Sequence, residues 1–128
     1  SDVSELDRAG AAGGLAGGLA AMGAELVDGV DLVAEELRLD ELVAGADLVV
    51  TGEGWLDASS FQGKVVGGVA AYAAAAGVPL LVVVGGAEHE AATRADVISL
   101  VDRYGADRAL AETMACITEA LAERLALL

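Results

Sequence analysis

The stretch TGEGWLDASSFQGKV, residues 51–65, holds the residues of this chain best suited to chemistry on a charged ligand. Lys64 is the single lysine of a chain with 21 acidic residues and a formal net charge of −14. Gly52, Gly54 and Gly63 permit unusual backbone dihedrals and let backbone N–H groups approach an anion. We therefore expect an anion to meet Lys64 in this stretch.

Two carboxylates of the same stretch, Glu53 and Asp57, suit Mg²⁺ or can accept a hydroxyl proton. Phosphoryl transfer needs cations on the phosphates and an oriented acceptor hydroxyl, so its ingredients are present. Ser59 and Ser60 are open between two roles, binding hydroxyls and N-caps of the next helix, and the sequence favours capping. Lys64 is open between a phosphate contact and a plain ion pair with Glu53 or Asp57.

Two standard nucleotide-binding patterns are absent from this stretch. The Walker pattern needs a glycine five positions before its Gly-Lys glycine and Ser or Thr after the lysine, and Ala58 and Val65 occupy those positions. The G-x-G-x-x-G dinucleotide pattern fails because Asp57 holds the place of the third glycine. The stretch is therefore neither a P-loop nor a standard NAD site.

Composition excludes several classes of partner. Seven basic residues against 21 acidic ones leave no basic patch for nucleic acid or for an anionic membrane surface. Residues 65–87 are uncharged enough to span a membrane, but Gly77 and Pro79 divide them, which favours a helix followed by a buried strand. Cys116 is alone, which predicts a buried helical thiol, a reducing environment and a cytoplasmic location.

The elements around residues 51–65 predict an α/β fold. Residues 46–52 form an apolar, β-branched run typical of a strand buried on both faces, and the glycine loop is expected to follow it. Residues 65–77 predict a helix, 80–86 a second buried strand and 97–102 a third strand. This order is typical of a parallel sheet flanked by helices, in which ligands bind beyond the carboxyl ends of the strands.

The two ends of the chain are predicted to be helical. From about Asp107 onward, one amphipathic helix should bury a stripe that repeats every three or four residues: Leu110, Met114, Ile117, Leu121, Leu125 and Leu128. Residues 1–45 form a glycine-rich, mainly helical segment, in which a helix over residues 29–37 should bury Val30, Val33 and Leu37. We expect residues 46–128 to be a separate α/β segment that carries the site.

Three blocks of the sequence together carry a family resemblance: GAAGGLAGGLAAMGAEL, GADLVVTGEGWLD and QGKVVGGVA. Their order and spacing are similar to the blocks GAAGGLG…GAEL, ADLVITGEG and R/S-x-D-x-Q-S/T-x-x-GK of the glycerate kinase family, bacterial glycerate 2-kinase type. The resemblance covers nearly the whole chain. Members of that family are much longer, and this chain resembles their C-terminal portion.

The resemblance implies ATP-dependent phosphorylation of D-glycerate, with ATP and Mg²⁺ as cofactors. Residues 1–45 would then be part of a second domain, and the portion missing at the N-terminus would contribute to the same cleft. Whether the protein forms a homo-oligomer stays open. The resulting site assignment has catalytic residues Asp57 and Lys64, metal ligands Asp57 and Glu53, and binding residues Gly52, Glu53, Gly54, Ser59, Ser60 and Gly63.

Two positions depart from the family pattern. Trp55 stands where Arg or Ser is usual, and Ser59 stands where Gln is usual. With the short length, these departures support an alternative interpretation. In it, the chain is a non-catalytic truncated or diverged homologue that acts as an oligomerisation or small-anion-binding module.

Overall fold

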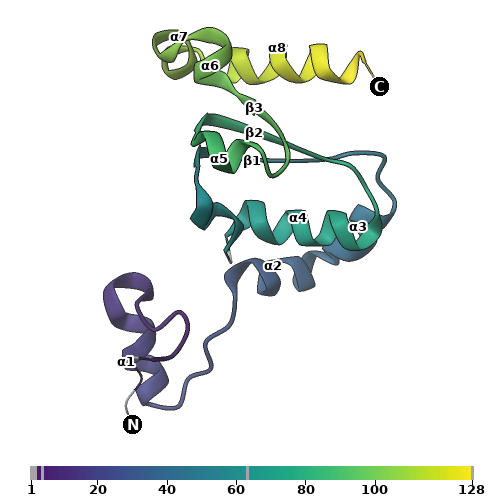
Figure 1. Cartoon of the computed structure of the whole chain (residues 1–128). Helices are drawn as coiled ribbons and strands as arrows, with labels where there is room; N and C mark the ends of the chain where they lie inside the picture. The colour runs from purple at the N-terminus through teal and green to yellow at the C-terminus, as the bar shows by residue number, and fades with distance from the viewer. Residues whose placement is uncertain (1–2, 4, 63, 128) are drawn as a thin grey trace.

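The computed structural model describes residues 3, 5–62 and 64–127 and contains a three-stranded parallel sheet between helices (Figure 1). The strands are β1 (Val49–Leu56), β2 (Leu80–Ala87) and β3 (Asp96–Ser99), in the order β1-β2-β3. Both outer strands pair with β2 in parallel. The α/β class, the parallel sheet and the helical segment before it are confirmed.

Helices cover the two faces of the sheet (Figure 1). One face packs on α4 (Val65–Ala76), and a short 3₁₀ helix, η2 (Ala58–Phe61), precedes α4. The other face carries three helices, α6 (Leu100–Tyr104), α7 (Ala106–Ala111) and α8 (Thr113–Leu125), while α5 (His89–Ala92) links β2 to β3. The N-terminal segment contains η1 (Ala11–Gly14), α1 (Leu15–Ala21), α2 (Gly29–Leu37) and α3 (Leu39–Ala44).

The central strand β2 supplies the core on both sides, as its unbroken apolar run predicts. Leu81 and Val83 pack with Leu100 and Cys116 on the face of α6 and α8. Val82 and Val84 belong to the opposite cluster, beneath α4. Successive side chains of a strand point to opposite faces, so one strand of consecutive apolar residues serves both clusters.

Helix α4 follows the sequence prediction closely. It ends at Gly77, whose left-handed backbone (φ 69°) lets its N–H bond the last turn, and Pro79 cannot continue the helix. Gly67 lets α4 lie against η2, because a Cβ there would be 2.7 Å from the carbonyl carbon of Phe61. These contacts fix the start of α4, and with it Lys64, next to the end of β1.

Strand β1 is longer than the sequence predicts. A loop was expected after Gly52, but pairing with β2 continues as far as Leu56, with Glu53 opposite Val84. Gly52 has no left-handed backbone conformation; instead, a Cβ there would collide with the carbonyl oxygen of Val83. The glycine is needed for close approach of two strands, and a turn is not its role.

Two further elements differ from expectation near the C-terminus. β3 ends at Ser99, whose hydroxyl caps α6 by accepting the N–H of Asp102 at 3.3 Å. The single helix expected from Asp107 is interrupted at Glu112, which has a non-helical backbone (φ −126°, ψ 36°) between α7 and α8. The chain therefore turns a corner where periodicity predicts a straight helix.

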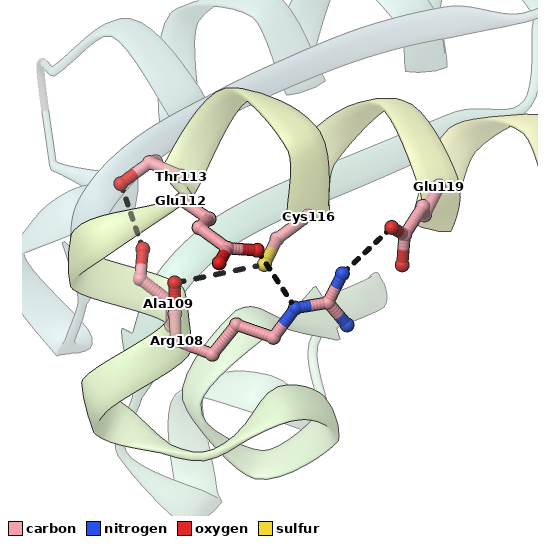
Figure 2. A network of polar contacts seen from close by, with 6 residues as sticks. All are labelled: Arg108, Ala109, Glu112, Thr113, Cys116 and Glu119. Carbon is pink, nitrogen blue, oxygen red and sulfur yellow. Dashed lines mark hydrogen bonds and ion pairs between the residues drawn. The ribbon is translucent and has the colours of Figure 1, made fainter.

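Arg108 braces this corner from α7 (Figure 2). Its guanidinium donates to Glu119 at 2.7 Å and to Glu112 at 3.1 Å, and these two hydrogen bonds, that to Glu119 first, raise the pKa of Arg108 above its ordinary value. The Thr113 hydroxyl donates to the carbonyl of Ala109 at 2.7 Å, across the break. The side chains of Arg108 and Thr113 thus join α7 and α8 across the interruption.

The buried face of this region also differs from the predicted stripe. Leu110 and Met114 are 79% and 74% exposed, whereas Cys116 and Ala120 are fully buried. Among the described members of the stripe, two pack against the core, Ile117 and Leu121, and Leu125 is half exposed. Small residues take the inner face, where Cys116 and Ala120 share one cluster with Leu81 and Val83 of β2. The buried thiol is confirmed, and Leu128 lies outside the described residues.

The N-terminal helices also bury small side chains. On α2, Ala34 is buried, while Val33 and Leu37, both expected inside, are 57% and 60% exposed. Val30 is half-buried and lies against Gly68 of α4. α2 and α3 pack beside α4, and α1 lies apart from the sheet (Figure 1). The proposed division at residue 45 stays a prediction.

In the described part of the chain, no helix combines the length and the apolar character that crossing a membrane requires.

Candidate functional site

The end of β1 leads into a tight turn organised by Asp57. Its Oδ1 accepts three hydrogen bonds, from the N–H of Ser59 at 2.7 Å, from the Ser59 hydroxyl at 2.6 Å and from the N–H of Ser60 at 3.2 Å. In return, the buried Ser60 hydroxyl accepts the N–H of Asp57 at 3.0 Å. This reciprocal capping box holds the start of η2.

These hydrogen bonds set the charge of the turn. The pKa of Asp57 lies below its ordinary value, chiefly because the Ser59 hydroxyl donates to its carboxylate; desolvation opposes this shift, and the charge of Lys64 adds to it. Asp57 is therefore ionised at neutral pH. A carboxylate with a lowered pKa is better suited to holding a cation than to removing a proton.

Lys64 is connected to Asp57 through one hydroxyl. Its Nζ donates to Ser59 Oγ at 2.5 Å, and Ser59 Oγ donates on to Asp57. No ion pair joins Lys64 directly to a carboxylate within residues 5–62 and 64–127. The direct ion pair with Asp57 or Glu53, considered from sequence, is not formed.

Lys64 is also the N-cap of α4. Its own side chain makes no capping bond, so the sequence-based expectation that the serines cap this helix is wrong; Asp57 and Ser60 cap η2. The first N–H groups of α4 have no intrahelical acceptor, as at any helix start. An exposed ammonium and free N–H groups therefore meet at one helix N-terminus, an arrangement that suits an anion.

Glu53 lies on β1, four residues before Asp57. Its Oε1 is buried and has no hydrogen-bond partner among the described residues. A buried carboxylate oxygen without a donor is costly, by about 1–3 kcal/mol or more for a charged group. Glu53 is thus the side chain of this region with the greatest unmet demand for a donor or a cation.

Glu53 and Lys64 line the same cavity, of about 730 Å³. Its walls come from α2, α3, β1 and α4 and are mainly apolar: Gly29, Val30, Val33, Ala34, Leu37, Leu39, Gly52, Val65 and Val69. Sequence reasoning did not assign the α2 side chains to the site. These side chains reach the cavity through tertiary packing. The one feature of the sequence that could have indicated them is the helical spacing of apolar residues in α2.

A second cavity, of about 760 Å³, lies on the other side of Glu53. It runs along β1 from Val50 to Trp55 and reaches α7 and α8 at Leu110 and Ile117. It contains no basic side chain. Glu53 therefore lines both cavities, and the first cavity is the one in which it meets Lys64.

The remaining predicted residues fall into three groups. Gly52 and Gly54 lie in β1 without positive φ, so the unusual dihedrals expected of them are absent; Gly63 lies outside the described residues. Phe61 packs against the core, with Arg94 over its ring at 5.5 Å. Trp55 is 57% exposed, with its ring edge over Gly86.

The metal-binding capacity of these residues is partial. No cluster of at least three His, Cys, Asp or Glu side chains occurs in the portion that the structure describes. Mg²⁺ is usually held by one or two carboxylates together with substrate phosphates and waters. Asp57 and Glu53 fit that partial role, because one is ionised and the other has a buried oxygen without a donor.

Comparison with known proteins gives a consistent result. A model of the glycerate kinase family matches residues 1–127. An uncharacterized protein of Synechocystis sp. is 38% identical over 119 residues, which are 92% of this chain and 32% of that protein. Escherichia coli glycerate 2-kinase is 37% identical over 107 residues, 83% of this chain and 26% of that enzyme.

A glycerate kinase of Halalkalibacterium halodurans is 45% identical over 85 residues, covering 66% of this chain and 22% of that protein. The chain thus spans between 22% and 32% of the length of these relatives. No solved structure matches it significantly.

Proposed function

The chain belongs to the glycerate kinase family, and on this premise we propose that it supplies the phosphate-binding portion of a kinase that transfers phosphate from ATP to D-glycerate. The observation that carries the proposal is the cavity shared by Lys64 and Glu53 at the start of α4. It joins a cation for the phosphates to a carboxylate for an acceptor hydroxyl or a metal ion.

Lys64 is proposed to bind a phosphate of ATP. Its ammonium is exposed, lies at a helix N-terminus and is held by Ser59 Oγ, so it has further donors for a ligand. The helix dipole and the free N–H groups of the first turn favour the same anion. Gly52, Gly54 and Gly63 are proposed to keep the surrounding backbone accessible to the phosphates.

The two carboxylates are proposed to divide the remaining work. Glu53 accepts the hydrogen of the glycerate hydroxyl or binds the cation, because its buried Oε1 lacks a donor. Asp57 keeps its negative charge and orients Lys64 through Ser59, and its lowered pKa disfavours a role as the base. Ser60 is proposed to act indirectly: its hydroxyl accepts the N–H of Asp57 and so fixes the turn that presents the other residues to the ligand.

Mg²⁺, when bound, would neutralise phosphate charge during transfer. In this proposal Asp57 and Glu53 would hold it together with the phosphates of ATP. The chain contributes the ligands and a largely apolar wall that limits water around them. The share of relatives that this chain covers makes complete turnover by the 128 residues alone a separate question.

A second candidate is a non-catalytic module that binds small anions or promotes oligomerisation. It is favoured by Trp55 and Ser59, which replace the residues usual in the family, and by the small share of each relative that the chain covers. ATP binding without glycerate-dependent ADP release, even when the rest of the family fold is supplied, would support it over the kinase.

Isothermal titration of the 128-residue chain with ATP in Mg²⁺ buffer tests the phosphate site. A hydrogen bond to a charged group contributes about 1.5–3 kcal/mol, so Lys64→Met should weaken binding by about 10- to 150-fold. Lys64→Arg should keep most of the affinity. Arg103→Met, which removes an exposed cation paired with Glu123 elsewhere, is the matched control and should change nothing.

Equal affinity of Lys64→Met and the unaltered chain would remove Lys64 from the site. The variant Glu53→Gln distinguishes a role of Glu53 in accepting the hydroxyl proton or binding the cation from a role in binding ATP itself. It should leave ATP affinity in Mg²⁺-free buffer unchanged, while turnover of D-glycerate by the completed protein should fall by about 100-fold or more, as expected for loss of a positioned proton acceptor.

A further inference from the structure

Trp55 is an aromatic side chain left open near the end of β1. β1 has an open edge, because it pairs with β2 alone among the described residues. Trp55 is 57% exposed and is the single tryptophan of the chain. It lies toward the carboxyl end of its strand, which is the end beyond which open parallel sheets bind ligands.

The ring of Trp55 rests on the neighbouring strand at Gly86. These two residues are partners in the pairing of β1 with β2. A Cβ at Gly86 would lie 2.5 Å from Cζ3 and 2.8 Å from Cε3 of Trp55. The backbone of β2 therefore supports the ring at a position without a side chain, while more than half of Trp55 stays accessible to solvent.

The exposed ring has no cation over it within the described part of the chain. The contacts there between an arginine and an aromatic ring involve Phe61 and Tyr104 and leave Trp55 free. A supported aromatic ring with an open face suits a planar aromatic ligand. Nucleobases stack on such rings in proteins, and the contact tolerates any base because every base has a π face.

The ring also lies close to the proposed phosphate site. Trp55 and Glu53 are two residues apart in one strand, so they share a face of β1 and are separated by about 7 Å along it. Glu53 lines the first cavity together with Lys64, and it lines the second cavity together with Trp55. A ligand whose anionic end lies at Lys64 can therefore place a planar group on Trp55.

We propose that Trp55 is the stacking surface for the purine base of the bound nucleotide, an inference that rests on the proposed binding of ATP phosphate at Lys64. The second cavity, where Trp55 lies, is lined mainly by apolar side chains, which suits a base. Gly86 is the positioning residue, because it lets the ring lie on β2. Trp55 stands where the family usually has Arg or Ser, so this stacking surface is a feature of the present chain.

A comparison of ATP with inorganic tripolyphosphate tests the proposal, because the two share a phosphate chain and differ in the nucleoside. In Mg²⁺ buffer, saturating ATP should quench the tryptophan fluorescence of the 128-residue chain, which comes from Trp55 alone, and tripolyphosphate should leave it unchanged. In isothermal titration, Trp55→Ala should weaken ATP binding by about 5- to 150-fold, the range of base–aromatic stacking, and leave tripolyphosphate binding unchanged. Trp55→Phe, which keeps an aromatic face, should recover most of the affinity.

Two further variants complete the design, and circular dichroism checks that each stays folded. Gly86→Ala should displace the ring and weaken the binding of ATP without weakening that of tripolyphosphate. Met114→Ala is the matched control, because it removes an apolar side chain that is 74% exposed and lines neither cavity. It should change neither affinity.

Equal losses for ATP and tripolyphosphate in Trp55→Ala, or ATP binding that leaves the fluorescence of Trp55 unchanged, would overturn the proposal. The same measurements separate it from the proposed function. If Lys64→Met weakens neither ligand, the phosphate site is wrong, and the difference between ATP and tripolyphosphate at Trp55 still decides the stacking. If the unaltered chain binds both ligands equally tightly, the stacking is wrong and the phosphate site stands.

Discussion

Gly52 offers a sharp test of how β1 and β2 pack. A Cβ at this position would lie closer than 3.0 Å to the carbonyl oxygen of Val83, a backbone atom that cannot rotate away. At Gly54, two residues further along the same strand, a Cβ would meet nothing within 4 Å. Neither glycine has positive φ, so backbone strain is the same for both substitutions.

The expected magnitudes follow from this contrast. Replacing a strand glycine by alanine gains about 0.5–1 kcal/mol from the unfolded chain, and this gain applies to both positions. Forcing a methyl group into a filled site costs about 1–3 kcal/mol, and this cost applies to Gly52 alone. Gly52→Ala should therefore be less stable than Gly54→Ala by about 1–3 kcal/mol.

Thermal denaturation followed by circular dichroism measures the difference. With about 2.1 cal/mol/K of unfolding entropy per residue, a chain of 128 residues changes its melting temperature by about 4 °C for each kcal/mol. Gly52→Ala should melt about 4–11 °C below Gly54→Ala. Equal melting temperatures would refute the close approach of the two strands at Gly52.

Three further predictions concern the turn, the corner and the core. The pKa of Asp57 is lower in the folded chain than its ordinary value of 3.8, so its ionised form stabilises the fold above pH 3.8, and this stabilisation is lost as the pH falls through the lowered pKa. In thermal denaturation, the unaltered chain should therefore be more stable than Asp57→Asn by a constant amount near neutral pH. This difference should shrink below pH 3.8. Arg108→Met should lower the free energy of unfolding in urea only slightly, because exposed ion pairs are weak, and the loss should diminish in 1 M salt. A loss that salt leaves unchanged would point to packing instead. Cys116 should react with a thiol reagent only on unfolding, since it is fully buried, and rapid labelling of the native chain would contradict its position on the inner face of α8.

Local signals explain the parts of the fold that the sequence predicts well. Gly77 and Pro79 end a helix by backbone geometry that needs no tertiary contact, so α4 and β2 are separated correctly. The apolar run of β2 predicts burial on both faces for the same reason. The site residues of the turn were also found by type, because carboxylate, hydroxyl and lysine side chains with that spacing suit an anion site.

Long-range contacts explain the parts that the sequence does not predict. Glu53 and Gly54 resemble loop residues, and only pairing with β2 makes this stretch part of a strand. The break at Glu112 involves neither glycine nor proline, so local rules do not locate it. The position of Ser59 in the sequence does not predict that its hydroxyl accepts a hydrogen bond from Lys64 while donating one to Asp57, because those bonds depend on how η2 packs against α4.

The open edge of β1 has a consequence for the behaviour of the isolated chain in solution. Exposed strand edges lead copies to add to one another, and mutual electrostatic repulsion is the main force that opposes this when the edge itself carries little protection. At neutral pH the net charge of −14 supplies that repulsion, but it vanishes near the isoelectric point of about 4.1. The same acidity that excludes nucleic acid thus acts as a colloidal stabiliser, and light scattering should rise as the solution approaches that pH or as salt screens the charge.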